Sequence, residues 1–276
     1  MSAQAAPIAG QRFAVIIPAR YQSSRYPGKP LAALRGATGE AKSLIQRSWE
    51  CAMAIPGARG VWVATDDDRI AYHVEAFGGA VVMTSSDLRN GTERCAEAAA
   101  RLDLDLDVVI NLQGDAPLTP VPIVEALVKA LADDPGAAMA TPGVACSASL
   151  YEHLVEDRRN GRVGGTTVVA NAAGHALYFS KQIIPYIPPA LEALGHDQVR
   201  LHLGLYAYRP SALRAYVATE PSRLELLEGL EQLRFLETDA KIRVVPVDPP
   251  DWDCIELNNP QDVPAIEAAL AARNLA

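Results

Sequence analysis

The feature that most constrains this chain is an alternation of short apolar runs with longer helical patterns through its first half. The runs are rich in β-branched residues and end in loops, as the buried strands of a parallel sheet do. The expected strands are 13–18, 61–65, 80–84 and 108–112, and the expected helices between them are 43–54, 67–77 and 91–102. This βαβ alternation predicts an α/β fold, doubly wound around a mostly parallel sheet with helices on both faces.

The second half has shorter strands and more turns. Residues 161–165 and 171–174 are typical of turns, and Ser222 is placed to cap a helix that runs through Phe235. The strands expected here are 166–170, 176–179, 203–208 and 242–247. We expect residues 1–12 to be a loose tail and residues 13–276 to form a single domain.

Charge, hydropathy and cysteine content argue against several function classes. The net charge of −8 disfavours nucleic acid as a partner. No apolar stretch is long enough to cross a bilayer, and the first residues lack the basic and apolar regions of a signal peptide. We therefore expect a cytoplasmic protein that engages no membrane. Its four cysteines, which share no metal-ligand spacing, are expected to be reduced thiols rather than a zinc site: Cys51, Cys95, Cys146 and Cys254.

A basic loop directly after the first strand carries the strongest functional signal. It places three cations, Arg20, Arg25 and Lys29, among hydroxyl residues such as Ser24. Ligands bind beyond the carboxyl ends of the strands in an open parallel sheet. A nucleoside triphosphate carries about four negative charges and needs cations that offset the charge growing on pyrophosphate. We interpret the loop as a triphosphate-binding element; the alternative is a solvated basic loop.

At this loop the sequence resembles the 3-deoxy-manno-octulosonate cytidylyltransferase (CMP-Kdo synthetase) family. The likeness runs from about Phe13 to Ala269, and its specificity lies in the order and spacing of motifs that are weak singly. Besides the loop (residues 17–31), the motifs are Val63-Ala-Thr-Asp66, Glu75-Ala-Phe-Gly-Gly79, Gly91-Thr-Glu-Arg94, Asn111-Leu-Gln-Gly-Asp115, Ala176-Leu-Tyr-Phe-Ser180, His202-Leu-Gly-Leu-Tyr-Ala-Tyr-Arg209 and Leu230-Glu-Gln-Leu-Arg234.

The resemblance implies a Rossmann-like, GT-A-like nucleotidyltransferase with a small β-rich lobe, roughly residues 140–210, for the acceptor sugar and dimerisation. It implies CTP and a small acidic sugar as substrates, Mg²⁺ as cofactor, and a homodimer. Arg20, Lys29 and Asp115 would be catalytic.

Asp115 follows the fourth strand, beside the expected phosphate loop. Mg²⁺ takes hard oxygens from one or two carboxylates plus substrate phosphates, and the resemblance makes Asp115 its ligand. The alternative is an Asp that caps the next turn. Gly91, Thr92 and Gln113 are expected near the nucleotide, since a glycine lets the backbone approach a base closely. Thr92 is equally compatible with a helix N-cap.

Five residues match acceptor-sugar positions of the family. His202 and Tyr206 lie four apart, so on one strand their side chains would share a face. The others are Lys181, Glu231 and Gln232. The alternative is a satisfied core histidine beside an ordinary Glu-Gln pair on a helix surface.

Near the C-terminus the sequence departs from the family pattern. Where the family has Val-Asp-Thr-Pro-Glu-Asp, whose first Asp is the second metal ligand, this chain reads Leu257-Asn-Asn-Pro-Gln-Asp262. The ligand position is therefore Asn258, which brings no charge. Thr166-Thr167 also replaces a Val-Lys pair of the family.

Three explanations of this departure remain open. A nearby carboxylate substitutes (Asp251, Asp253 or Glu256), metal binds more weakly and only with nucleotide, or the acceptor differs from Kdo. We favour the third, in combination with the first.

The sequence thus predicts transfer of CMP from CTP to the anomeric hydroxyl of a Kdo-like 2-keto sugar acid, with release of pyrophosphate. Two other classes stay open. One is a sugar-phosphate nucleotidyltransferase that uses another nucleoside triphosphate. The other is a catalytically weak nucleotide-binding homologue, motivated by Asn258.

Overall fold

The computed structural model describes residues 8–22, 25–191, 195–248 and 256–276. The centre of the fold is a parallel sheet of β5 (Ala80–Met83), β4 (Val61–Thr65), β1 (Phe13–Pro18) and β6 (Val108–Leu112), in that spatial order. The chain runs outward from β1 to β4 and β5 and then returns to β6 on the other side of β1. This order confirms the predicted doubly wound α/β class, and the carboxyl ends of β1 and β6 lie side by side where it reverses.

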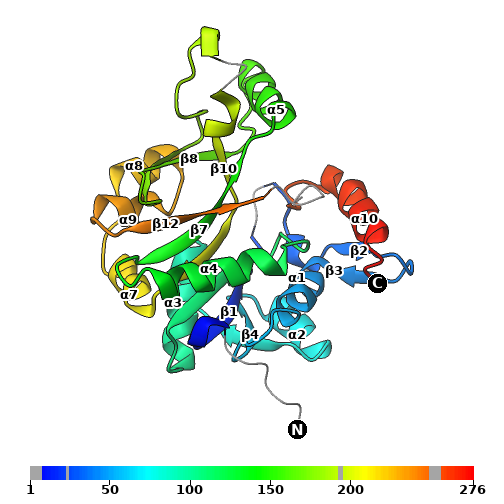
Figure 1. The fold of residues 1–276 in the computed structure, drawn as a ribbon. Helices are drawn as coiled ribbons and strands as arrows, with labels where there is room; N and C mark the ends of the chain where they lie inside the picture. The colour runs from blue at the N-terminus through cyan, green and yellow to red at the C-terminus, as the bar shows by residue number, and fades with distance from the viewer. Residues whose placement is uncertain (1–7, 23–24, 192–194, 249–255) are drawn as a thin grey trace.

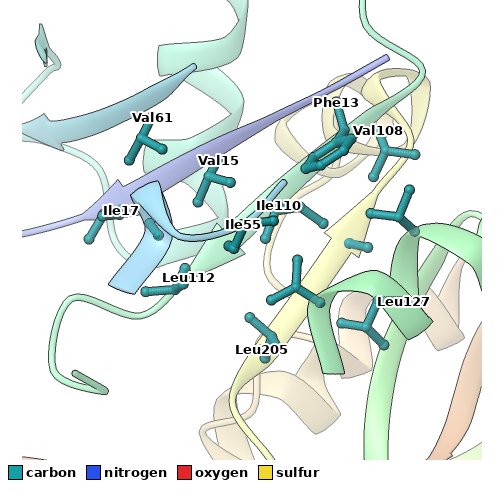
Figure 2. Close-up of a cluster of buried hydrophobic side chains, with 14 of the residues drawn as sticks. Phe13, Val15, Ile17, Ile55, Val61, Val108, Ile110, Leu112, Leu127 and Leu205 are labelled. Atoms are coloured by element: carbon teal, nitrogen blue, oxygen red, sulfur yellow. The ribbon is translucent and has the colours of Figure 1, made fainter. Parts of the chain in front are cut away.

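Helices cover both faces of this sheet because its central strands are buried on both sides. Phe13, Val15 and Ile17 of β1 pack on one face, while Ile16 packs on the other. The first face is covered by α1 (Leu44–Met53), α2 (Asp68–Ala76) and α4 (Val121–Asp133). The second is covered by α3 (Gly91–Leu102), α7 (Pro210–Val217) and α9 (Leu233–Glu237). Figure 2 shows side chains of the first face meeting between β1, β6 and Leu127 of α4.

Polar residues fix where the first helices begin. The side chains of Ser43, Asp67 and Asn90 each accept a hydrogen bond from a backbone N–H in the first turn of α1, α2 and α3. The α2 helix ends before Gly78, whose φ of +85° places it in the left-handed region. These caps explain why the sequence predicts the helix boundaries so closely.

A mostly antiparallel extension, in which one strand pair is parallel, continues the sheet into a lobe (Figure 1). It contains β7 (Met139–Ala145), α5 (Ala148–Arg159), β8 (Thr166–Ala170), β9 (Ala176–Ser180) and β10 (Arg200–His202), together with β11 (Leu205–Tyr208) and β12 (Ile242–Val247). The β7 strand joins both parts. Met139 and Ala140 pair with β11, whereas residues 143–145 pair with β10.

The remaining elements lie at the edges. A hairpin of β2 (Ala33–Arg35) and β3 (Ala41–Ser43) packs against α10 (Val263–Ala272), and α8 (Arg223–Glu228) precedes α9. Short 3-10 turns are Ile8–Gly10, Lys29–Leu31, Pro189–Leu191, His196–Gln198 and Pro260–Asp262. Across the described ranges, none of the helices combines the length and apolarity that a bilayer span requires.

Three details differ from the sequence predictions. The strand expected at 203–208 is the shorter β11, Leu205–Tyr208, and the sequence did not predict β10, which ends at His202 just before it. The helix expected from Ser222 through Phe235 is interrupted at Gly229, whose φ is +61°, although Ser222 does cap it. The described part of the expected loose tail is docked, because Ile8 packs on the core and Arg12 pairs with Asp107.

Candidate functional site

A cleft of about 300 Å³ opens at the carboxyl ends of β1 and β6 and at the N-terminus of α3. The basic loop forms one wall, the α3 N-terminus the opposite wall, and the residues after β6 the floor. Its lining includes most of the predicted nucleotide-binding and catalytic residues: Arg20, Arg25, Lys29, Gly91, Gln113 and Asp115. The structure therefore brings together side chains that lie almost a hundred residues apart in the sequence. Predicted Ser24 lies outside the described residues.

The basic loop is closed on itself before any ligand binds. The N–H of Gly28 donates to the carbonyl of Tyr21 at 2.9 Å, and Gly28 has a φ of +71°. A Cβ at Gly28 would lie 3.1 Å from the Tyr21 ring, so this close approach also favours glycine. The Arg69 guanidinium covers that ring at 3.3 Å. These contacts fix the described residues on either side of 23–24 as one wall of the cleft.

Lys29 and Asp115 meet at the base of the cleft. The Lys29 Nζ donates to Asp115 Oδ2 at 2.6 Å, and their side chains are 15% and 24% exposed. This ion pair joins the basic loop to the acidic residue on the floor of the cleft, and both side chains remain partly accessible to solvent. An Asp115 side chain that only capped the next turn would not make this ion pair with Lys29.

The α3 N-terminus supplies the opposite wall. Asn90 is the N-cap, with its side chain accepting from the N–H of Glu93 at 2.8 Å. The N-cap role considered for Thr92 is therefore wrong. The Thr92 hydroxyl is buried against the hydroxyl of Tyr208 at 2.9 Å, and its N–H donates to Glu231. A Cβ at Gly91 would be in ordinary van der Waals contact with Pro18, Asn111 and Gln113, at 3.5 to 3.9 Å, so the glycine packs closely against the floor of the cleft.

Glu231, Gln232 and Tyr206 form a polar group deeper in the site. Glu231 lines the cleft, and burial raises the pKa of its carboxyl, although the Thr92 N–H at 2.9 Å favours the charged form. Burial and the nearby carboxylates of Glu231 and Glu256 raise the pKa of Tyr206. The Nε2 of Gln232 is buried and has no partner among the described residues. A buried donor of this kind needs an acceptor that the described side chains do not supply, which an ordered water or a polar ligand would provide.

His202 fits the core-histidine alternative better. It is 8% exposed, and its Nε2 lies 2.8 Å from the hydroxyl of Thr141. That hydroxyl donates its one proton to the Leu205 carbonyl at 2.8 Å, so His202 is the donor. Burial lowers the pKa of His202 to about 3, which makes it neutral. Its ring lies 5.5 Å from that of Tyr206. The two residues are not on one strand as expected, because His202 is on β10 and Tyr206 is on β11.

Lys181 does not line the main cleft, although its Nζ lies 2.9 Å from where a Cβ on Gly229 would stand, two residues before Glu231. It follows β9, two strands away from β10, and lines a separate cavity with Arg158 and Arg162. Thr167, which replaces a family lysine, is a buried structural hydroxyl. It donates to the carbonyl of Gln182 at 2.6 Å and accepts from the N–H of Ile184 at 3.2 Å. The structure therefore does not bring Lys181 to the main cleft.

The segment that departs from the family pattern lies against Asp115. The N–H of Leu257 donates to the Asp115 carbonyl at 2.9 Å. The Oδ1 of Asn258 accepts a hydrogen bond from the guanidinium of Arg25 at 3.0 Å, so this amide is paired with the basic loop. The Glu256 carboxyl lies next to Asp115, and burial together with that neighbouring charge raises its pKa. Asp251, Asp253 and Cys254 lie outside the described residues.

The donors on the floor fit a hard cation that arrives with a nucleotide. In the part of the chain that the structure describes, no group of three or more His, Cys, Asp or Glu side chains is placed to hold a metal alone. Asp115 lies on the floor, and the hydrogen bond from the Leu257 N–H to its carbonyl brings the neighbouring residue Glu256, with a second carboxylate, to the same part of the site. Mg²⁺ is commonly held by one or two carboxylates plus phosphate oxygens, so substrate phosphates would complete this site.

Comparison with known proteins gives a consistent result. A family model described as cytidylyltransferase matches residues 14–242. A 3-deoxy-manno-octulosonate cytidylyltransferase of Maricaulis maris is 45% identical, over 93% of this chain and 96% of that protein. The mitochondrial enzyme of that name from Arabidopsis thaliana is 38% identical, over 94% and 83%. A solved CMP:2-keto-3-deoxy-manno-octonic acid synthetase complexed with CTP superposes with a TM-score of 0.81, at 35% identity over 95% and 99% of the two chains.

Proposed function

Because this chain belongs to the cytidylyltransferase family, we propose that it transfers CMP from CTP to the anomeric hydroxyl of a Kdo-like 2-keto sugar acid. The protein is a CTP-dependent nucleotidyltransferase. The observation that carries the proposal is the single cleft in which Lys29 and Asp115 meet at 2.6 Å, beside Arg20, Arg25 and Gly91. That arrangement suits a triphosphate with its metal at one end and a base at the other.

The reaction needs no covalent enzyme intermediate. The sugar hydroxyl attacks the α-phosphorus in line, a new P–O bond forms, and the bond to pyrophosphate breaks. Arg20, Arg25 and Lys29 hold the triphosphate and offset the charge that grows on the leaving pyrophosphate. Mg²⁺ held by Asp115 supplies, when bound, positive charge at the reacting phosphate. The role of the protein is mainly to position the two substrates and stabilise charge.

The deeper polar group is suited to the acceptor. Tyr206, Glu231 and Gln232 offer a hydroxyl, a carboxyl and an unpartnered amide within reach of a polyhydroxylated acid. We assign His202 a supporting role, since its ring packs against Tyr206 and its Nε2 is already bonded.

The assembly we propose is a homodimer in the cytoplasm. Light scattering should give twice the mass of one chain, and a monomer mass would contradict the proposed dimer.

A pyrophosphate-release screen tests the function. It pairs CTP, UTP, GTP and dTTP with a panel of 2-keto sugar acids and sugar 1-phosphates. We expect turnover only with CTP and a sugar acid. Turnover with UTP, GTP or dTTP and a sugar phosphate would identify a pyrophosphorylase-type enzyme. Tight CTP binding without release from any acceptor would identify a nucleotide-binding homologue.

Variants of Lys29 and Asp115 test the roles proposed for these two residues in CMP transfer. Lys29→Ala and Asp115→Ala should each lower turnover by about 100-fold or more while the fold is retained, since each removes a charge from the reacting centre. The matched controls are Lys129→Ala and Asp133→Ala, which break an exposed ion pair on α4. These should leave turnover unchanged. Near-normal turnover in either Lys29→Ala or Asp115→Ala would remove that assignment.

A further inference from the structure

The segment Glu256-Leu257-Asn258 is anchored to the floor of the cleft at two points. The Leu257 N–H donates to the Asp115 carbonyl at 2.9 Å. Its side chain is fully buried among apolar residues that include Leu44 of α1 and Leu270 of α10. With Leu257 fixed on both its backbone and its side chain, the residues before and after it are held beside Asp115.

Asn258 is poorly suited to bind a cation in this position. Its Oδ1 accepts a hydrogen bond from the Arg25 guanidinium at 3.0 Å, which holds a positive charge beside the oxygen that would approach a metal ion. Its Nδ2 faces Glu256 Oε2 at 3.5 Å. Asn258 therefore links a cation of the basic loop to a carboxylate, and the amide adds no negative charge of its own.

Glu256 carries the negative charge that Asn258 lacks. The charges acting on its carboxylate are Asp115, Lys29 and Arg25, which are the charges of the cleft corner itself. Its Oε1 lies 3.5 Å from the position that a Cβ on Gly204 would occupy, so it faces the β10–β11 turn below the cleft. This part of the cleft thus holds two carboxylates, from Asp115 and Glu256, and two cations, Lys29 and Arg25. Their charges offset one another.

A bound triphosphate would disturb this balance. Its phosphates attract Lys29 and Arg25, and the two carboxylates are then left without their cations at a place where they repel each other. A divalent cation bound to the phosphates restores the balance. We propose that Glu256 supplies the second carboxylate of the metal–nucleotide site, in place of the uncharged Asn258. This inference rests on the proposed function and names a residue of that same site.

Binding of Mn²⁺ tests the inference without turnover. Mn²⁺ shares the octahedral oxygen preference of Mg²⁺, and its free concentration can be followed by electron paramagnetic resonance. The full chain is saturated with a non-hydrolysable α,β-methylene analogue of CTP and titrated with Mn²⁺. We expect Glu256→Gln and Asp115→Asn each to weaken Mn²⁺ binding roughly tenfold or more. Asn258→Ala and the exposed control Glu152→Gln should change it less than threefold.

A rescue variant excludes a merely structural effect. Glu256→Gln combined with Asn258→Asp moves the carboxylate back to the position used by the family, and it should regain most of the lost Mn²⁺ affinity. Glu256→Gln binding Mn²⁺ as the wild type does would overturn the inference, as would a loss in Asn258→Ala instead. Unchanged Mn²⁺ binding with a raised KM for the acceptor would place Glu256 in the sugar pocket. A wild type that bound neither the analogue nor Mn²⁺ would overturn the proposed function as well.

Discussion

At the scale of single residues, the site is built from charges that are paired but not deeply buried. Lys29 and Asp115 are partly exposed, and pairs of this kind contribute little to folding stability. The Asp107 carboxylate, whose pKa the Arg12 guanidinium lowers to about 2, lies in a different part of the molecule and serves to dock the N-terminal segment. The Lys29–Asp115 pair is therefore better explained by ligand binding than by a contribution to folding stability.

His202 gives a prediction about pH. Burial lowers its folded-state pKa to about 3, whereas an unfolded chain takes up the proton near 6.5. Between these values the unfolded state binds more protons, so His202 makes stability fall as the pH is lowered from about 6.5 towards 3. The steepest contribution is about 1.4 kcal/mol per pH unit. His202→Gln should flatten the curve of unfolding free energy against pH, measured by urea titration.

The control for His202 is His153→Gln, which changes an exposed histidine on α5. Because this exposed side chain lies 3.5 Å from Asp157 and is not buried, its removal should change the curve less than His202→Gln does. If the His202→Gln curve ran parallel to that of the wild type, His202 would not be the buried neutral group described here.

How much of the site the sequence predicts depends on how local each signal is. The basic loop, Gly91 and Asp115 were predictable because each follows a strand or opens a helix, and parallel strands gather such residues at one edge. The outcomes for Lys181, Thr92 and Asn258 were not predictable. Each depends on a partner far away in the chain: Glu228, Tyr208 and Arg25, respectively.

At the scale of elements, a buried network joins the α3 N-terminus to α8 and α9. Arg234 is 1% exposed and donates to both oxygens of Glu225, at 2.6 and 2.7 Å. It also lies 3.4 Å from Glu93. Tyr216 extends the network to Asn90, the cap of α3, at 2.9 Å. The wall of the cleft is therefore fixed by residues outside the cleft.

Arg234→Met should destabilise the protein by about 3–5 kcal/mol, because the buried carboxylate of Glu225 would lose its cation and Glu93 would keep only Arg89. Urea unfolding followed by circular dichroism measures the change. Arg214→Met, on the exposed side of α7, should cost less than about 0.5 kcal/mol. A cost equally small at Arg234 would mean that Glu225 and Glu93 are neutral or solvated, and would contradict the network.

Local patterns predicted most elements but not how distant ones pair. The strands β1, β4, β5 and β6 could be predicted because their apolar runs and capped helices are continuous in sequence. The antiparallel insertion of β11 between β6 and β7 could not, since it depends on the pairing of Leu205 with Leu112. The break at Gly229 shows the same limit, because a capped apolar pattern continues through it.

At the scale of the whole molecule, a nucleotide that binds only the folded chain must stabilise it. CTP with Mg²⁺ at a hundred times its dissociation constant adds about 2.7 kcal/mol. For a chain of this size that corresponds to a rise in Tm of roughly 5–10 °C. Differential scanning fluorimetry should show this rise for CTP and a smaller one for UTP and GTP. Equal rises with all three nucleotides would mean that the wall near Gly91 does not select the base.

The contact between Leu257 and Asp115 has a consequence for biosynthesis. The phosphate loop and the floor of the cleft are translated more than a hundred residues before the segment that packs on the floor. A nascent chain that has released the first four parallel strands still lacks the carboxylate of Glu256. Such an intermediate would have a partial nucleotide pocket, and the pocket would be completed only when the later segment folds onto its floor.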